Sequence, residues 1–167
     1  MQSAFANLAA QLITFLILVK KTIHCKVLTN MSTTDPLDSA HQSIILAADK
    51  SLALLQQLPA LGKLTTIVIQ GGCVFEYKGD FPPGEVGMGF YNLQNNGQGF
   101  EGHIKLESID RIQLESKLHR GRQSYAFVFY AVKGLIFKVF LGRDKEGELL
   151  AHQVNFFKQL ASGKITL

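Results

Sequence analysis

The chain of 167 residues is 47% hydrophobic and 18% charged. This composition excludes disordered and fibrous proteins and, with this length, predicts about one folded domain. The formal net charge is +4, but residues 1–30 hold three of the 17 lysines and arginines and none of the 13 acids, so residues 31–167 have a net charge of +1. Such a nearly neutral body argues against a nucleic-acid partner, which would need a large basic surface.

The first thirty residues differ from the rest of the chain. An apolar run from Leu8 to Val19 is too short to span a membrane. Lysines follow this run, whereas a secretory signal has them in front. We predict that the native chain starts at Met31 and that residues 1–30 are an extension. The competing interpretation is a helix anchored at a membrane surface, but its polar face would carry little charge beyond the lysines.

The two cysteines, Cys25 and Cys73, are too few for a disulfide framework and are typical of a reduced, cytoplasmic protein. The sequence has no CxxCH or CxxC motif, which excludes covalent haem attachment of the c type and a thioredoxin-like redox site.

Residues 31–62 are predicted to form an N-terminal helical segment, and residues 63–167 an α+β domain. Asp38 or Ser39 is a suitable cap for a helix that ends at Pro59. The apolar stripe at helical spacing consists of Ile44, Ile45, Ala48, Leu52 and Leu55.

Short segments that alternate between apolar and polar residues, separated by glycine-rich turns, predict a series of antiparallel strands. Two prolines place a loop over residues 80–84, and Asn95-Asn96-Gly97 predicts a turn. The expected strands are 64–70, 73–78, 88–93, 100–106, 109–116, 125–131 and 135–141.

A second helix is expected near the C-terminus, with Asp144 as its cap and with Leu150, Val154 and Phe157 on one stripe. Together these elements predict an α+β fold: a curved antiparallel β-sheet or partly open barrel with flanking helices.

Signals for chemistry are few. The sequence contains no GxSxG, HExxH or P-loop motif, and no catalytic residue is predicted. The glycine-rich segment 84–89 follows two prolines and opens a strand rather than a helix, so it is a weak candidate for holding a nucleotide phosphate.

His103 lies between Glu101 and Lys105 on the polar face of a predicted strand. It is either a hydrogen-bonded surface histidine or a ligand of a metal or haem iron that projects outward from the sheet. Tyr91, in a neighbouring strand, is either a core or rim aromatic or a second candidate ligand or stacking partner.

The segment Lys117–Arg122 is basic. It is either a solvated hairpin or a cradle in which Arg120 and Arg122 hold an anionic group such as a carboxylate.

Four segments, supported by Gln153-Val154 and Phe156 in the last helix, resemble the ChuX/HutX haem-utilisation carrier family in their order and near-family spacing. The resemblance runs from about Lys50 to Leu160. The segments are Leu64-Thr65-Thr66-Ile67-Val68, Gly89-Phe90-Tyr91-Asn92-Leu93, Glu101-Gly102-His103-Ile104-Lys105 and Phe137-Lys138-Val139-Phe140-Leu141-Gly142-Arg143-Asp144.

This resemblance implies a cytoplasmic protein that binds haem b non-covalently and passes it on after import, with a haem-degrading enzyme as a downstream partner. It also implies relatives of the ChuS/HemS type that carry the unit twice, so that a single-unit chain is expected to form a homodimer. No nucleic acid and no membrane is expected among its partners.

Residue by residue, the family's histidine in a Gly-His-Ile strand corresponds to His103, which is therefore the implied iron ligand. Phe90 and Tyr91 are expected near the haem ring, with Tyr91 as the alternative ligand. Arg120 and Arg122 are expected to contact the propionates.

Four features depart from the family pattern: the segment Leu118-His119-Arg120 where members often have an apolar stretch, an N-terminal helical region shorter than usual, and two positions near the expected site. Ile69 or Gln70 stands where some members have a second histidine, and Phe90-Tyr91 stands where some have two tyrosines. If neither His103 nor Tyr91 binds iron, His119 is the next candidate. We expect a haem carrier and not an enzyme. The alternatives are a haem-degrading enzyme of the ChuS/HemS type and an interaction module that no longer binds haem.

Overall fold

The computed structural model describes residues 42–97 and 99–167, which belong to one compact unit, Ser39–Leu167. Residues 1–30, the start predicted at Met31 and the caps predicted at Asp38 and Ser39 lie outside the described residues. Within the part that is described, no helix is both long and apolar enough to cross a membrane.

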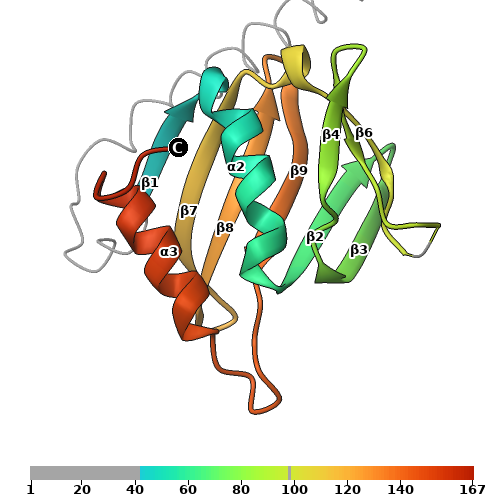
Figure 1. The fold of residues 1–167 in the computed structure, drawn as a ribbon. Helices are drawn as coiled ribbons and strands as arrows, with labels where there is room; N and C mark the ends of the chain where they lie inside the picture. The colour runs from blue at the N-terminus through green and yellow to red at the C-terminus, as the bar shows by residue number, and fades with distance from the viewer. Residues whose placement is uncertain (1–41, 98) are drawn as a thin grey trace, which may run out of the picture. The chain divides into compact units, whose positions relative to one another are not determined.

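A six-stranded antiparallel sheet forms the body of the unit (Figure 1). Its strand order is β1-β7-β8-β9-β2-β3, so that the two earliest strands do not lie next to each other. The strands are β1 (Gln42–Ala47), β2 (Lys63–Gln70), β3 (Cys73–Asp80), β7 (Arg111–His119), β8 (Arg122–Ala131) and β9 (Gly134–Leu141).

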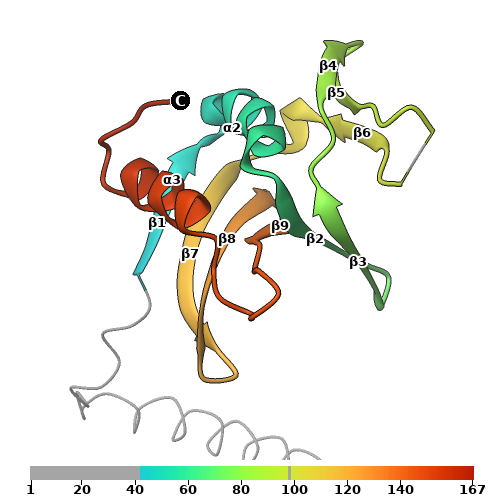
Figure 2. The ribbon, with the colours of Figure 1, turned by 60° about the horizontal axis from the view of Figure 1, so that its bottom comes forward.

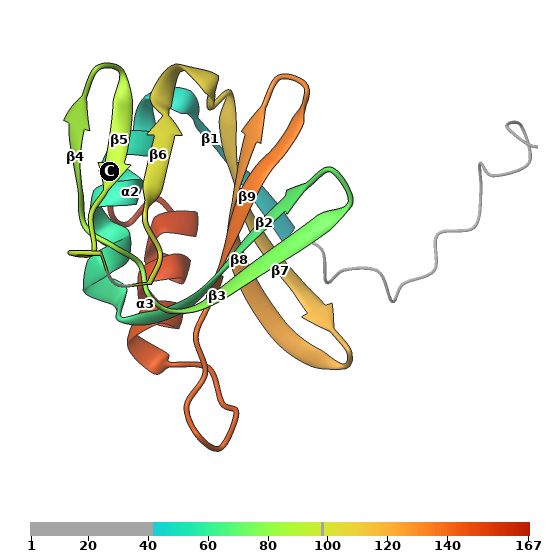
Figure 3. The ribbon, with the colours of Figure 1, turned by 90° about the vertical axis from the view of Figure 1, so that its right-hand side faces the viewer.

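A second, three-stranded antiparallel sheet has the order β4-β5-β6. It lies on the side of the first sheet that holds β2 and β3 (Figures 1 and 3). Its strands are short: β4 (Gly84–Gly87), β5 (Phe90–Leu93) and β6 (Gly102–Lys105). Met88 and Gly89 connect β4 to β5 with φ angles of 54° and 82°, the positive values that a tight hairpin turn requires.

Helices α2 (Ser51–Gln57) and α3 (Ala151–Ala161) lie on the same face of the six-stranded sheet (Figure 2). Short 3-10 turns flank α2 at Ala48–Lys50 and Leu58–Leu61, and a third follows β6 at Leu106–Ser108. We call the face that these helices cover the inner face of the sheet, and the opposite one its outer face.

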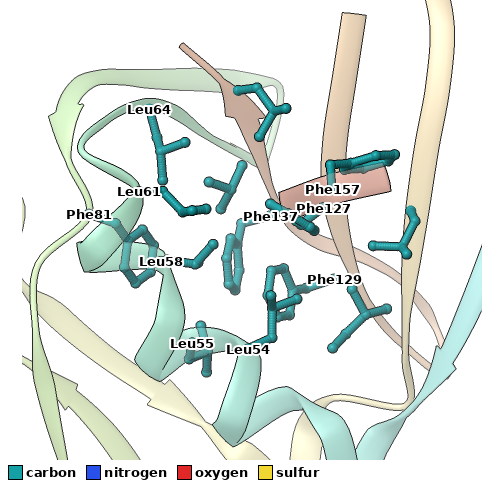
Figure 4. Packing of buried hydrophobic residues seen from close by; sticks show 14 of the residues in the cluster. Leu54, Leu55, Leu58, Leu61, Leu64, Phe81, Phe127, Phe129, Phe137 and Phe157 are labelled. Atoms are coloured by element: carbon teal, nitrogen blue, oxygen red, sulfur yellow. The ribbon is translucent and has the colours of Figure 1, made fainter. Parts of the chain in front are cut away.

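The core fills the space between the inner face and the helices (Figure 4). Leu54 from α2 and Leu58 from the 3-10 turn after it meet Phe127 and Phe129 from β8, and all four are fully buried. Phe129 stacks on Phe137 of β9 with ring centroids 4.3 Å apart. Strand β8 is also buried on its outer side, at Ala126 and Val128. The prediction that this strand is central is therefore confirmed, as is the α+β class with open antiparallel sheets.

The predicted N-terminal helix is wrong over its first half, because Gln42–Ala47 forms strand β1. Ile44 and Leu46 pack against the core whereas Ile45 is 62% exposed, which is the alternation of a strand. Pairing with β7, which places β1 at the edge of the sheet, outweighs a helical pattern that is complete only from residue 48 onward. Since β1 joins the same sheet, the segment before Lys63 is part of the same unit.

Two further boundaries differ from prediction. The segment expected as one strand from Met88 to Leu93 begins only at Phe90, after the tight turn. Asp144 does not cap α3, which begins at Ala151. Instead its Oδ1 accepts a hydrogen bond of 2.7 Å from the backbone N–H of Glu148. Asp144 therefore stabilises the turn before the helix, a role that short acidic side chains often take.

Candidate functional site

His103 lies on the solvent-exposed face of the three-stranded sheet. In the antiparallel register, Asn92 of β5 is directly opposite His103, and Tyr91 is opposite Ile104. Because successive strand residues point to opposite faces, Phe90, Asn92 and His103 share the exposed face while Tyr91 and Ile104 face the core. The prediction that His103 is not a core residue is confirmed by its exposure.

The imidazole of His103 is held by a side-chain amide that the sequence analysis did not single out. His103 Nδ1 lies 2.7 Å from Asn92 Oδ1. The other end of the same amide, Asn92 Nδ2, donates to the backbone carbonyls of Glu85 at 3.2 Å and Gly87 at 3.3 Å on β4. Side chains and backbone from all three strands thus fix the ring by its Nδ1 edge. Among residues 42–97 and 99–167, no hydrogen bond reaches Nε2.

Phe90 provides an aromatic surface next to this imidazole. Its ring centroid lies 6.3 Å from that of His103, with an interplanar angle of 79°, so the two rings meet edge to face. An exposed imidazole nitrogen beside an aromatic ring is a suitable combination for an iron atom carried in a flat, apolar macrocycle. The residues present therefore fit a haem on this face.

Tyr91 does not share this face. Its side chain is 1% exposed, and burial raises its pKa, an effect that a hydrogen bond with the backbone of Gly84 only partly offsets. A Cβ at Gly84 would lie 2.8 Å from the Tyr91 ring, so the glycine-rich segment 84–87 makes room for a buried tyrosine. This packing, rather than phosphate binding, accounts for the glycine at position 84. The structure places Tyr91 in the core, not beside His103.

Charged groups frame the strand that carries His103. The Glu101 carboxylate accepts hydrogen bonds from the backbone N–H groups of Asn95 at 2.9 Å and Gly97 at 2.7 Å, and these bonds lower its pKa. Lys105, two residues beyond His103 on the same exposed face, pairs with Glu107 at 2.5 Å. That hydrogen bond lowers the pKa of Glu107. Lys105 is therefore the cation on this face that strand alternation places next to His103.

The basic turn of residues 117–122 lies elsewhere. The turn between β7 and β8 is at the opposite end of the unit from β6 (Figures 1 and 3). The Arg122 guanidinium donates to the Gly147 carbonyl and to Glu148 Oε1. Arg120 and Arg122 line a cavity of about 750 Å³ together with His119, Lys78 and Phe140. The structure does not bring these arginines to His103.

Comparisons with known proteins agree with this fold. The family model described as haem utilisation ChuX/HutX matches residues 44–160. HutX of Vibrio cholerae serotype O1, described as an intracellular heme transport protein, is 38% identical over 134 residues, which are 78% of this chain and 69% of HutX. The structure of the heme binding protein ChuX aligns with a TM-score of 0.67 and 30% identity, covering 74% of this chain and 78% of ChuX.

A longer protein shares the fold. The heme degrading enzyme ChuS of Escherichia coli O157:H7 aligns with a TM-score of 0.59, but at 20% identity and over only 35% of its own chain, against 72% of this one. That likeness shows the fold alone. The family model spans well over half of the chain and HutX is 38% identical over most of it, so this chain belongs to the ChuX/HutX haem utilisation family.

Proposed function

We propose that this protein binds haem b non-covalently and carries it through the cytoplasm to a downstream haem-degrading enzyme. The observation that carries the proposal is the exposed imidazole of His103, held at Nδ1 by Asn92 and bordered by Phe90. Membership in a family that includes an intracellular heme transport protein and a heme binding protein supports it.

In this proposal His103, Phe90 and Lys105 on the exposed face each make a different contact with the haem. A neutral imidazole supplies a nitrogen lone pair to the iron of the cargo. Phe90 contacts the edge of the macrocycle, where an aromatic ring gains from apolar contact. Lys105 stands two residues from His103 on the same face. Its ammonium group, now paired with Glu107, would be the partner of a haem carboxylate. The sequence has no CxxCH motif for attachment of the c type, which supports non-covalent binding.

Transport is proposed in place of haem degradation. HutX, at 38% identity, is described as a heme transport protein, and ChuX, at 30%, as a heme binding protein. The heme degrading enzyme is related at only 20%. Addition of a reductant in air to the haem-loaded protein should leave its Soret band intact, whereas a degrading enzyme would destroy it.

Replacing His103 by alanine tests the proposed site. We expect the Soret band of the hemin complex to shift and the Kd for hemin to rise by about tenfold or more, because alanine offers no lone pair to iron. Stability should stay within about 0.5 kcal/mol, since the side chain is at the surface. Hemin titration followed by absorbance, together with urea unfolding, measures both quantities.

Two matched variants accompany this experiment. His119→Ala removes another exposed strand histidine, at the far end of the unit, and should leave the spectrum unchanged. Tyr91→Phe removes only the buried hydroxyl and should do the same. A spectrum that responds to Tyr91→Phe but not to His103→Ala would contradict the assignment of His103 as the iron ligand.

We further propose that the protein forms a homodimer through the outer face of the six-stranded sheet. Ile45 and Val74 are each 62% exposed on this face, and Ile69 is 43% exposed. Exposed apolar side chains that gather on one face of a protein are typical of a protein–protein interface.

Light scattering should therefore give a mass of twice 18.4 kDa for the full chain at micromolar concentration. Ile45→Lys places a charge on the proposed interface and should shift the protein toward the monomer. Met88→Lys is the matched control, because Met88 is 99% exposed in the turn between β4 and β5, outside the six-stranded sheet. A monomer for the unmodified chain, or equal dissociation by both variants, would contradict the proposed interface.

A further inference from the structure

We propose that Asn92 is a positioning residue that holds His103 in the Nδ1–H tautomer and leaves the Nε2 lone pair directed away from the sheet. The use of that lone pair for iron rests on the proposed function. The tautomer itself follows from the hydrogen bonds around Asn92.

The direction of the Asn92 amide is determined by strand β4. Its Nδ2 faces the backbone carbonyls of Glu85 and Gly87, at 3.2 and 3.3 Å. Carbonyl oxygens only accept hydrogen bonds, so the amide end that faces them must be the NH₂ group. The carbonyl end of the side chain, Oδ1, is thereby turned toward strand β6.

The direction of the amide then determines the proton on the imidazole. Oδ1 of Asn92 lies 2.7 Å from His103 Nδ1 and can only accept, so Nδ1 carries the hydrogen. A neutral imidazole has one N–H and one bare nitrogen, and the bare nitrogen is therefore Nε2. In the other tautomer, two lone pairs would face each other across 2.7 Å.

A glycine makes this arrangement possible. A Cβ at Gly87 would lie 3.2 Å from Asn92 Nδ2, closer than such atoms ordinarily approach. Glu85, Asn92 and His103 are also opposite one another across three neighbouring strands. The amide is consequently held by backbone on one side and by the register of two strands on the other, and only its Oδ1 faces the histidine.

Fixing the second nitrogen of a ligating histidine orients the ring and sets its tautomer before the metal arrives. The loss of such a partner typically costs 10- to 100-fold in metal affinity. We therefore expect Asn92→Leu, which keeps the size of the side chain but accepts no hydrogen bond, to raise the Kd for hemin by about 10- to 100-fold.

The test begins without haem. Long-range ¹H–¹⁵N correlation NMR of the full chain at pH 8 reports which imidazole nitrogen carries the proton. We expect the Nδ1–H tautomer of His103 in the unmodified protein and in Asn92→Asp, which keeps an acceptor, and its loss in Asn92→Leu. Asn155→Leu, on the exposed side of α3, is the matched control and should change neither the tautomer nor hemin binding.

An Nε2–H tautomer of His103 in the unmodified protein, or an Nδ1–H tautomer that persists in Asn92→Leu, would overturn the proposal. The first of these results does not depend on whether any variant folds. Hemin binding that is insensitive to His103→Ala would instead remove the proposed function, and the NMR result would still decide the role of Asn92. The two failures are therefore distinguishable.

Discussion

Replacing Gly142 by alanine should destabilise the fold by about 3 kcal/mol or more. Gly142 directly follows β9, whose last residue, Leu141, pairs with Leu64 of β2. An added Cβ would overlap the backbone carbonyl oxygen of Lys63 and would also touch the Leu150 side chain. A backbone oxygen cannot move aside as a flexible side chain can, so the ends of β9 and β2 would have to separate.

Urea unfolding followed by circular dichroism measures this loss. Gly102→Ala is the matched control, because a Cβ at Gly102 meets no atom within 4 Å. Its stability should change by no more than about 0.5 kcal/mol. Equal stabilities of the two variants would mean that the chain around Lys63 yields more easily than its packing indicates.

The second large effect is expected at Gln153, a polar side chain that is fully buried. Its Oε1 accepts from the Gly142 N–H at 2.7 Å, and its Nε2 donates to the carbonyls of Leu61 at 2.7 Å and Lys63 at 2.9 Å. One side chain of α3 thus satisfies three backbone groups at the start of β2 and the end of β9. The Leu61 carbonyl also lies 2.9 Å from His152 Nε2, so Gln153→Leu takes away the partner of the Gly142 N–H and of the Lys63 carbonyl. Since each buried group left without a partner costs about 1–3 kcal/mol, this substitution should cost about 3 kcal/mol.

Gln159→Leu, on the same helix, is the matched control for this substitution. Gln159 donates to Asn155 at 3.2 Å in an exposed position, and its loss should change the stability by no more than about 0.5 kcal/mol. Thermal or urea unfolding of both variants measures the difference. A Gln153→Leu protein as stable as the Gln159→Leu protein would show that water replaces the lost partners.

Local pattern was sufficient for much of the sheet. The strands on either side of Gly71-Gly72 alternate in polarity, and glycines mark the turns at both ends of β8, so these elements were predictable from neighbouring residues. Strand β1 was not, because its six residues are also compatible with a helical stripe. Only its pairing with β7, some seventy positions away in the chain, decides between the two structures.

The same distinction between local and distant information applies to the candidate site. Strand alternation alone predicts that His103 is exposed, and the structure agrees. Alternation did not reveal Asn92, because its contact with His103 depends on the register of β5 against β6. Nor could it show that Tyr91 faces the core, or that the β7–β8 turn lies far from β6, since both depend on how the two sheets are placed.

The strand order also has a consequence for folding while the chain is synthesised on the ribosome. The hairpin of β2 and β3 is made early, yet β2 acquires its second neighbour, β9, only after residue 134 has been synthesised. Helix α3, whose Gln153 joins β2 to β9, emerges last. Non-local pairings of this kind slow folding and leave strand edges open to aggregation while the chain grows. The second edge of β2 therefore stays unpaired until β9 has been synthesised.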